Sequence, residues 1–141
     1  MNGPGAKGAT LTLGYAGLIP FVLPAILVIV GSSHAALAQT IAGAYALAIL
    51  CFLFGSWWGM AQRSGVAATL WLSNALLLAA LGFYLFAPGW WPLAAALLLV
   101  VAWLTEQNRQ LFPEYPSAYK RLRAVLTGLA AASMLAIQLL A

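Results

Sequence analysis

The chain has 141 residues, of which 65% are hydrophobic and 6% are charged, and its mean hydropathy is +0.98. A soluble domain carries roughly 25% charged residues, so this composition excludes an ordinary water-soluble fold. Six basic residues against two acidic ones give a net charge of +4. Because the basic residues flank apolar segments instead of forming a stripe on a polar surface, we expect anionic lipid headgroups as their partners and predict no nucleic-acid binding.

A helix rises about 1.5 Å per residue, so it needs about 20 residues to cross roughly 30 Å of hydrocarbon. Apolar segments of this length follow one another along the chain. The residues left over are too few for a second domain. The sequence therefore predicts an all-α integral membrane protein, a single bundle of five transmembrane helices. The predicted spans are residues 11–30, 38–62, 66–86, 90–112 and 118–140, preceded by a flexible tail at 1–10.

All six basic residues fall on one side of the membrane when these spans are threaded through it. Lys7 precedes the first span and Arg63 follows the second, while the other four lie between the fourth and fifth spans: Arg109, Lys120, Arg121 and Arg123. Cytoplasmic loops carry an excess of Lys and Arg. We therefore predict a cytoplasmic N-terminus and a C-terminus on the opposite side.

The first span contains Pro20 and Pro24, which share one helix face because they are four residues apart. A proline removes an N–H donor and crowds the carbonyl four residues back, so we expect a packing kink near the middle of this span. An ion site at the break is the alternative, but the first three spans offer few polar partners for one. Residues 36–38 resemble a signal-peptide cleavage site, yet the preceding apolar run is span-length, so we expect it to be retained.

The second span carries Gly55 and Gly59, a small-xxx-small pair that lets another helix approach closely in lipid. We expect this pair to pack inside the bundle, with an interface to a partner protein or a second copy as the alternative. Trp57 and Trp58 lie about one turn from Arg63, so we expect them to anchor the helix at headgroup depth. Stacking on a hydrophobic cofactor is the alternative for these tryptophans.

The fourth span has a short apolar stretch and carries Glu106, and we expect its helix to continue as a polar extension until Pro113. A carboxylate inside the membrane would indicate a functional site. We favour instead a structural ion pair at the interface, with Arg109 three residues later as the partner and Arg63 as the alternative.

The fifth span begins with Lys120, Arg121 and Arg123, which lie where the helix dipole disfavours cations. Phosphates of anionic lipids would offset that cost, so we expect general headgroup anchoring here, with a specific lipid site as the alternative. His34 is the single histidine, and no set of residues has the spacing of metal ligands or of a nucleophile with its base. The sequence therefore predicts no metal, no cofactor and no catalysis.

Residues 13–21, 49–59 and 119–127 resemble three motifs of domain-of-unknown-function family 3429, the transmembrane protein 69-like group. The resemblance covers nearly the whole chain and implies a bacterial or mitochondrial inner-membrane protein without an assigned activity. The family's second motif usually ends Gly-x-His-Trp-Gly, whereas this chain has Trp57 in place of the histidine, so a proton or metal role of that position is absent. Glu106 falls roughly where the family often has an aspartate.

From these features we expect a non-catalytic protein that acts by interaction, as an accessory or assembly subunit or as a homo-oligomer. The alternative is a binding or transport protein for a lipid- or quinone-like hydrophobic ligand at the basic face. An ion channel is less favoured, because a conduction path needs polar lining. The candidate ligand site comprises Trp57, Trp58, Arg63, Glu106, Arg109, Lys120, Arg121 and Arg123.

Overall fold

The computed structural model describes residues 4–111, 113 and 115–141, and these residues form helices and no strand. The elements are α1 (Pro4–Ala16), α2 (Ile19–Ile29), α3 (Ala35–Ser64), α4 (Ala67–Phe86), the short 3₁₀ helix η1 (Pro88–Trp90), α5 (Trp91–Asn108) and α6 (Ser117–Leu140). Five helical stretches are long and apolar enough to cross a membrane, with α1 and α2 forming one of them and η1 and α5 another. The predicted all-α class with five membrane-spanning segments is confirmed.

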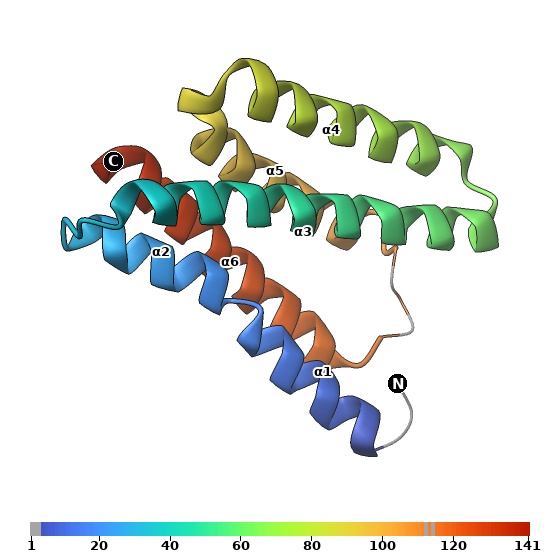
Figure 1. Ribbon diagram of the computed structural model, residues 1–141. Coiled ribbons are helices and arrows are strands. Elements are labelled where there is room, and N and C mark those ends of the chain that lie inside the picture. The colour runs from blue at the N-terminus through green and yellow to red at the C-terminus, as the bar shows by residue number, and fades with distance from the viewer. Residues whose placement is uncertain (1–3, 112, 114) are drawn as a thin grey trace.

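The helices alternate in direction, so the chain's connections gather at two ends of the bundle (Figure 1). The start of α1, the α3–α4 turn and the α5–α6 connection lie at one end, and the α2–α3 turn, the α4–α5 turn and the C-terminus lie at the other. All six basic residues belong to segments at the first end, which we call the basic end. Toward the basic end, α1 and the first half of α6 diverge from α3 (Figure 1).

The first span is broken at Gly17 and Leu18, between the end of α1 and the start of α2. Pro20 lies four residues after Ala16, whose carbonyl its ring crowds, so the α-helix cannot run through this point unchanged. At the break, the Leu18 N–H bonds the Tyr15 carbonyl three residues back, at 3.1 Å, in place of the α-helical bond four residues back. The predicted kink is present, whereas Pro24 is buried inside α2 without interrupting it.

Two helix ends differ from the prediction by four residues or more. Of the tail predicted at residues 1–10, residues 4–10 belong to α1, and residues 1–3 lie outside the described residues. A proline such as Pro4 suits the first turn of a helix, where the N–H that it lacks would have no partner. The second difference is the end of the fourth span, which was predicted at residue 112, whereas α5 ends at Asn108.

Gln110 ends α5, because it adopts the left-handed conformation with φ of 48°. The N–H of Gln110 bonds the Gln107 carbonyl at 3.3 Å, and the N–H of Leu111 bonds the Glu106 carbonyl at 3.2 Å. These two bonds define a Schellman motif, which closes a helix and usually has glycine at the left-handed position.

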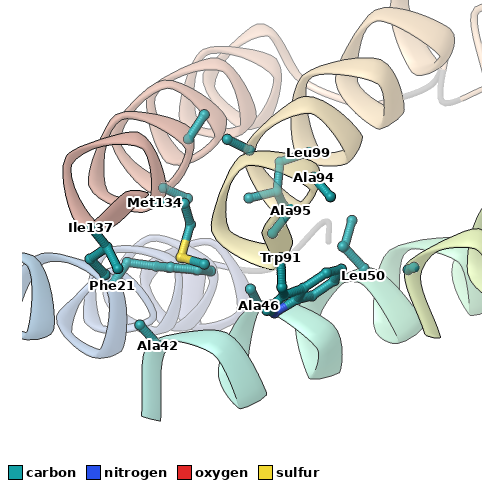
Figure 2. Packing of buried hydrophobic residues seen from close by; sticks show 14 of the residues in the cluster. Phe21, Ala42, Ala46, Leu50, Trp91, Ala94, Ala95, Leu99, Met134 and Ile137 are labelled. Carbon is teal, nitrogen blue, oxygen red and sulfur yellow. The ribbon is translucent and has the colours of Figure 1, made fainter. Parts of the chain in front are cut away.

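The core lies where α2, α3, α5 and α6 meet, and alanines make up much of it (Figure 2). Small side chains let helices approach closely where lipid supplies no hydrophobic driving force. Trp91 of α5 lies over Ala46 and Leu50 of α3, and its indole Nε1–H donates to the Gly43 carbonyl at 2.9 Å. On the other side of the core, Met134 and Ile137 of α6 face Phe21 of α2; all three side chains are buried.

Candidate functional site

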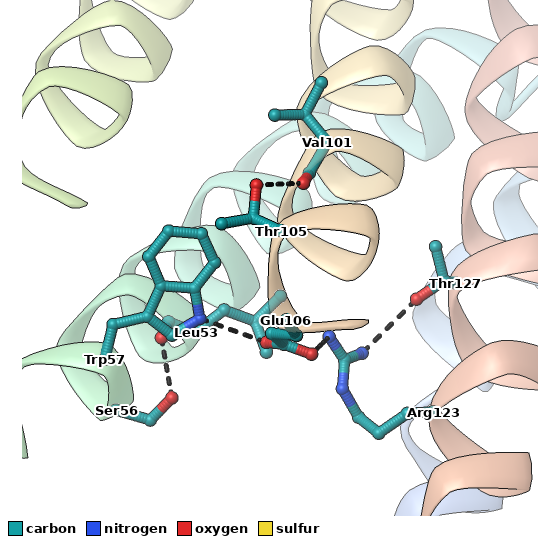
Figure 3. Close-up of polar contacts among 8 residues, drawn as sticks. All are labelled: Leu53, Ser56, Trp57, Val101, Thr105, Glu106, Arg123 and Thr127. Atoms are coloured by element: carbon teal, nitrogen blue, oxygen red, sulfur yellow. Dashed lines mark hydrogen bonds and ion pairs between the residues drawn. The ribbon is translucent and has the colours of Figure 1, made fainter. Parts of the chain in front are cut away.

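A buried carboxylate joins three helices near the basic end. Glu106 lies on α5 and is 6% exposed. The indole Nε1–H of Trp57 on α3 donates to its Oε1 at 3.1 Å, and Nη2–H of Arg123 on α6 donates to its Oε2 at 2.7 Å (Figure 3). Arg123 also donates from Nη1 to the Thr127 hydroxyl at 3.3 Å. Both carboxylate oxygens are therefore bonded in a place where an unpaired charge would be costly.

The predicted partners of Glu106 are wrong. Arg109 was expected to meet Glu106 because the two residues are three positions apart, but α5 has already ended at Asn108, and Arg109 is exposed. Glu106 points into the bundle toward α6, so its partner is Arg123, 17 positions away in the sequence. The ion pair is also more buried than expected, with side chains 11% and 4% exposed.

The two adjacent tryptophans of α3 have different environments, because successive residues on a helix point about 100° apart. Trp57 is completely buried, and its ring packs edge-on against Phe54 with centroids 5.1 Å apart. The expectation that Trp57 anchors the helix at headgroup depth is therefore wrong. Trp58 is 44% exposed, and an anchoring role for it stays a prediction.

Gly55 and Gly59 lie on the same outward face of α3 as Trp58. A Cβ added to either glycine meets no atom of the described chain within 4 Å, so the expected packing of this pair inside the bundle is wrong. The close helix approach occurs instead at Gly14, where a Cβ would come within 2.8 Å of a methyl group of Leu122. We call the surface formed by Phe52, Gly55, Trp58 and Gly59 the outer face of α3.

A cavity of about 290 Å³ opens beside the ion pair, and we call it the polar cavity. Glu106, Lys120 and Arg123 carry its charge, and their formal charges of −1, +1 and +1 leave a net +1. Its remaining walls come from Gln107 in the last turn of α5 and from Gln110 and Pro113, which follow α5. This lining favours an anion, or the negative end of a dipole.

A second cavity of about 400 Å³, the apolar groove, lies between α1, α2, α3 and α6. Leu13 of α1, Ile49 of α3 and Leu126 of α6 are among its apolar walls. Arg123 lines both the polar cavity and the apolar groove. A charged compartment and an apolar compartment thus meet at one guanidinium group.

Arg63 and Arg109 face a third cavity of about 530 Å³, which we call the arginine cleft. It lies among the end of α3, the start of α4 and the residues after α5, and Tyr115 also lines it. The structure therefore divides the predicted site. The polar cavity is lined by Glu106, Lys120 and Arg123, and Trp57 is bonded to the Glu106 carboxylate. The arginine cleft holds Arg63 and Arg109 instead. None of the three cavities is lined by Arg121 or Trp58.

Thr127 and Tyr45 are site residues that sequence reasoning missed; Thr127 bonds Arg123, and both line the apolar groove. The four-residue spacing from Arg123 to Thr127 puts the two on one helix face, a local signal that could have been used. No such signal exists for Tyr45, which reaches the groove from another helix. Among the residues that the structure describes, no group of three or more His, Cys, Asp or Glu side chains could hold a metal ion.

Comparison with known proteins identifies relatives over nearly the whole chain. The model of a family described as "Protein of unknown function (DUF3429)" matches residues 6–139. Transmembrane protein 69 of Xenopus tropicalis is 35% identical over 137 residues, which cover 92% of this chain and 53% of that protein. The chain thus spans about half the length of the curated relative that it matches. No solved structure matches it.

Proposed function

The chain belongs to this family of proteins of unknown function, and we propose that it is a binding or transport protein for an amphipathic membrane molecule, a lipid or a quinone-like compound, held at the basic end. One observation carries the proposal: the polar cavity and the apolar groove meet at Arg123. An amphipathic molecule needs two such compartments side by side, because its polar group must keep hydrogen bonds while its apolar part leaves water.

The cations of the polar cavity retain capacity for a ligand. Arg123 has five N–H donors and uses one on Glu106 and one on Thr127. Lys120 makes no ion pair with any residue that the structure describes. A negatively charged or strongly polar group in the cavity would therefore find donors that the described residues do not satisfy.

The proposal assigns binding without catalysis. Both oxygens of Glu106, the one carboxylate among the described residues of the polar cavity, already accept hydrogen bonds, from Trp57 and from Arg123, so Glu106 is poorly placed to act as a base. The family resemblance and the clustering of basic residues at one end favour a bacterial or mitochondrial inner membrane with the basic end on the cytoplasmic or matrix side.

A second function, as an accessory or assembly subunit or as a homo-oligomer, is favoured by the outer face of α3. Gly55 and Gly59 add no side chain to this face, which leaves space for the backbone of another helix, and Phe52 is 73% exposed beside them. The two sites are neighbours, because Phe52 belongs to the outer face and also lines the apolar groove.

Native mass spectrometry of the protein extracted gently from its own membrane tests both functions. The ligand proposal expects one copy that retains one stoichiometric small molecule. Leu126→Trp, which fills the apolar groove, should abolish that retention, and Leu129→Trp, on an exposed position three residues later, should not. A bare monomer would overturn the ligand proposal. A defined oligomer or a second protein would support the role of the outer face.

A further inference from the structure

We propose that the molecule bound at this site is an anionic glycerophospholipid from the leaflet at the basic end, with its phosphate in the polar cavity and one acyl chain in the apolar groove. This inference rests on the proposed function and narrows it to one class of ligand. Three properties of the two cavities lead to it: the length of the groove, the charge of the polar cavity, and the way the groove is reached.

The length of the apolar groove matches one leaflet. Along α6, the groove is lined from Tyr119 to Ala130, which are 11 residues apart. At about 1.5 Å per residue this is roughly 16 Å, close to half of the ~30 Å hydrocarbon thickness of a bilayer. An acyl chain that starts at headgroup depth and ends near the midplane has this length.

The charge of the polar cavity matches one phosphodiester. Lys120, Arg123 and Glu106 leave a net charge of +1, which a single phosphate anion neutralises. Guanidinium and ammonium groups are the side chains that bind phosphate most often, the first through paired N–H donors and the second as a point charge. An uncharged quinone head would leave this charge uncompensated. A phosphate would also offset the unfavourable position of Lys120 in the first turn of α6.

The apolar groove can be reached from the bilayer. Leu13 and Phe52 line it and are 72% and 73% exposed on the outside of the bundle. An acyl chain can therefore enter sideways from the leaflet while its headgroup stays at the depth of Arg123. A water-soluble phosphate compound would use only the polar cavity and gain nothing from the groove.

The test measures the affinity of the full chain in detergent for defined molecules, added one at a time and detected by native mass spectrometry. The probes are phosphatidylglycerol, phosphatidylcholine with the same acyl chains, glycerol phosphate, and a short-tailed quinone. We expect phosphatidylglycerol to bind about tenfold more tightly than phosphatidylcholine, and glycerol phosphate to bind far more weakly than either. Lys120→Gln should weaken phosphatidylglycerol binding about fivefold, the usual effect of one basic residue near an anionic lipid.

Arg121→Gln is the matched control, because it removes the same charge from the next residue of α6 without touching either cavity. Equal losses of phosphatidylglycerol affinity in Lys120→Gln and Arg121→Gln would show non-specific attraction to lipid and overturn the inference.

Equal binding of phosphatidylglycerol and phosphatidylcholine would overturn the inference as well. Binding of the quinone alone would overturn the lipid class while leaving the proposed function standing, and binding of no probe would count against both. Leu126→Trp should abolish phosphatidylglycerol binding if the chain occupies the groove, and unchanged binding would refute that placement.

Discussion

Removing the guanidinium of Arg123 tests the role of the buried ion pair. Arg123→Gln should lower the free energy of unfolding by about 3–5 kcal/mol, the usual effect of breaking a buried pair from one side. The pair is short, at 2.7 Å, and its side chains are 11% and 4% exposed, so water replaces the lost partner poorly. Of the two side-chain donors to the Glu106 carboxylate that the structure describes, Trp57 alone would remain.

Glu106→Gln should cost less, about 1–3 kcal/mol, because its amide oxygen still accepts from Trp57, and Arg123, the more exposed of the pair, keeps its hydrogen bond to Thr127. The double variant Glu106→Gln/Arg123→Gln leaves no unpaired charge, so it should be more stable than Arg123→Gln alone. The assay is unfolding of the purified protein in mixed micelles with increasing sodium dodecyl sulfate, followed by tryptophan fluorescence, with Arg121→Gln as the control. A double variant whose loss equals the sum of the single losses would refute the coupling.

Three further variants test separate features by the same unfolding assay. Gln110→Gly should raise stability by about 1 kcal/mol, because glycine adopts the left-handed conformation at the end of α5 without strain; a loss would contradict that geometry. Trp57→Phe should cost about 1.5–3 kcal/mol in the wild type and clearly less when Glu106 is already glutamine. Gly59→Leu should leave the stability of the isolated bundle unchanged or slightly higher, since its Cβ meets nothing in the described chain, and any oligomer should dissociate in size-exclusion chromatography.

The features that the sequence predicted well depend on local chemistry. Hydropathy marks the spans because every residue in the bilayer must be apolar or satisfied. The break before α2 follows from Pro20, whose ring acts on its own helix. The end of α5 is also local, but glutamine occupies the position that glycine usually marks, so the sequence carried no visible signal at Gln110.

The features that the sequence predicted poorly depend on which side of a helix faces the bundle. In a soluble protein, polar residues mark the outer side, whereas both sides of a membrane helix are apolar. Gly55 and Gly59 therefore look like Gly14 in the sequence, although only Gly14 lies against another helix. For the same reason Trp57 and Trp58 could not be separated into a buried and an exposed residue.

The choice of Arg123 over Arg109 as the partner of Glu106 reflects the arrangement of whole helices. Because α5 and α6 run antiparallel from one connection, Glu106 near the end of α5 faces Arg123 near the start of α6 (Figure 3). The sequence showed that the basic residues belong to one end of the bundle. It could not show that Arg63 and Arg109 line a cleft separate from the ion pair.

Arg123 has two roles, and this determines how variants at the site can be interpreted. It neutralises Glu106 and so ties α6 to α5, and it also forms the boundary between the polar cavity and the apolar groove. A change at Arg123 therefore alters stability and ligand binding together and cannot separate them.

Lys120 lines only the polar cavity, so its removal reports on binding alone. Because a ligand that binds the native state stabilises it, added phosphatidylglycerol should raise the unfolding midpoint of the wild type more than that of Lys120→Gln. Equal increases would mean that the lipid acts elsewhere on the bundle.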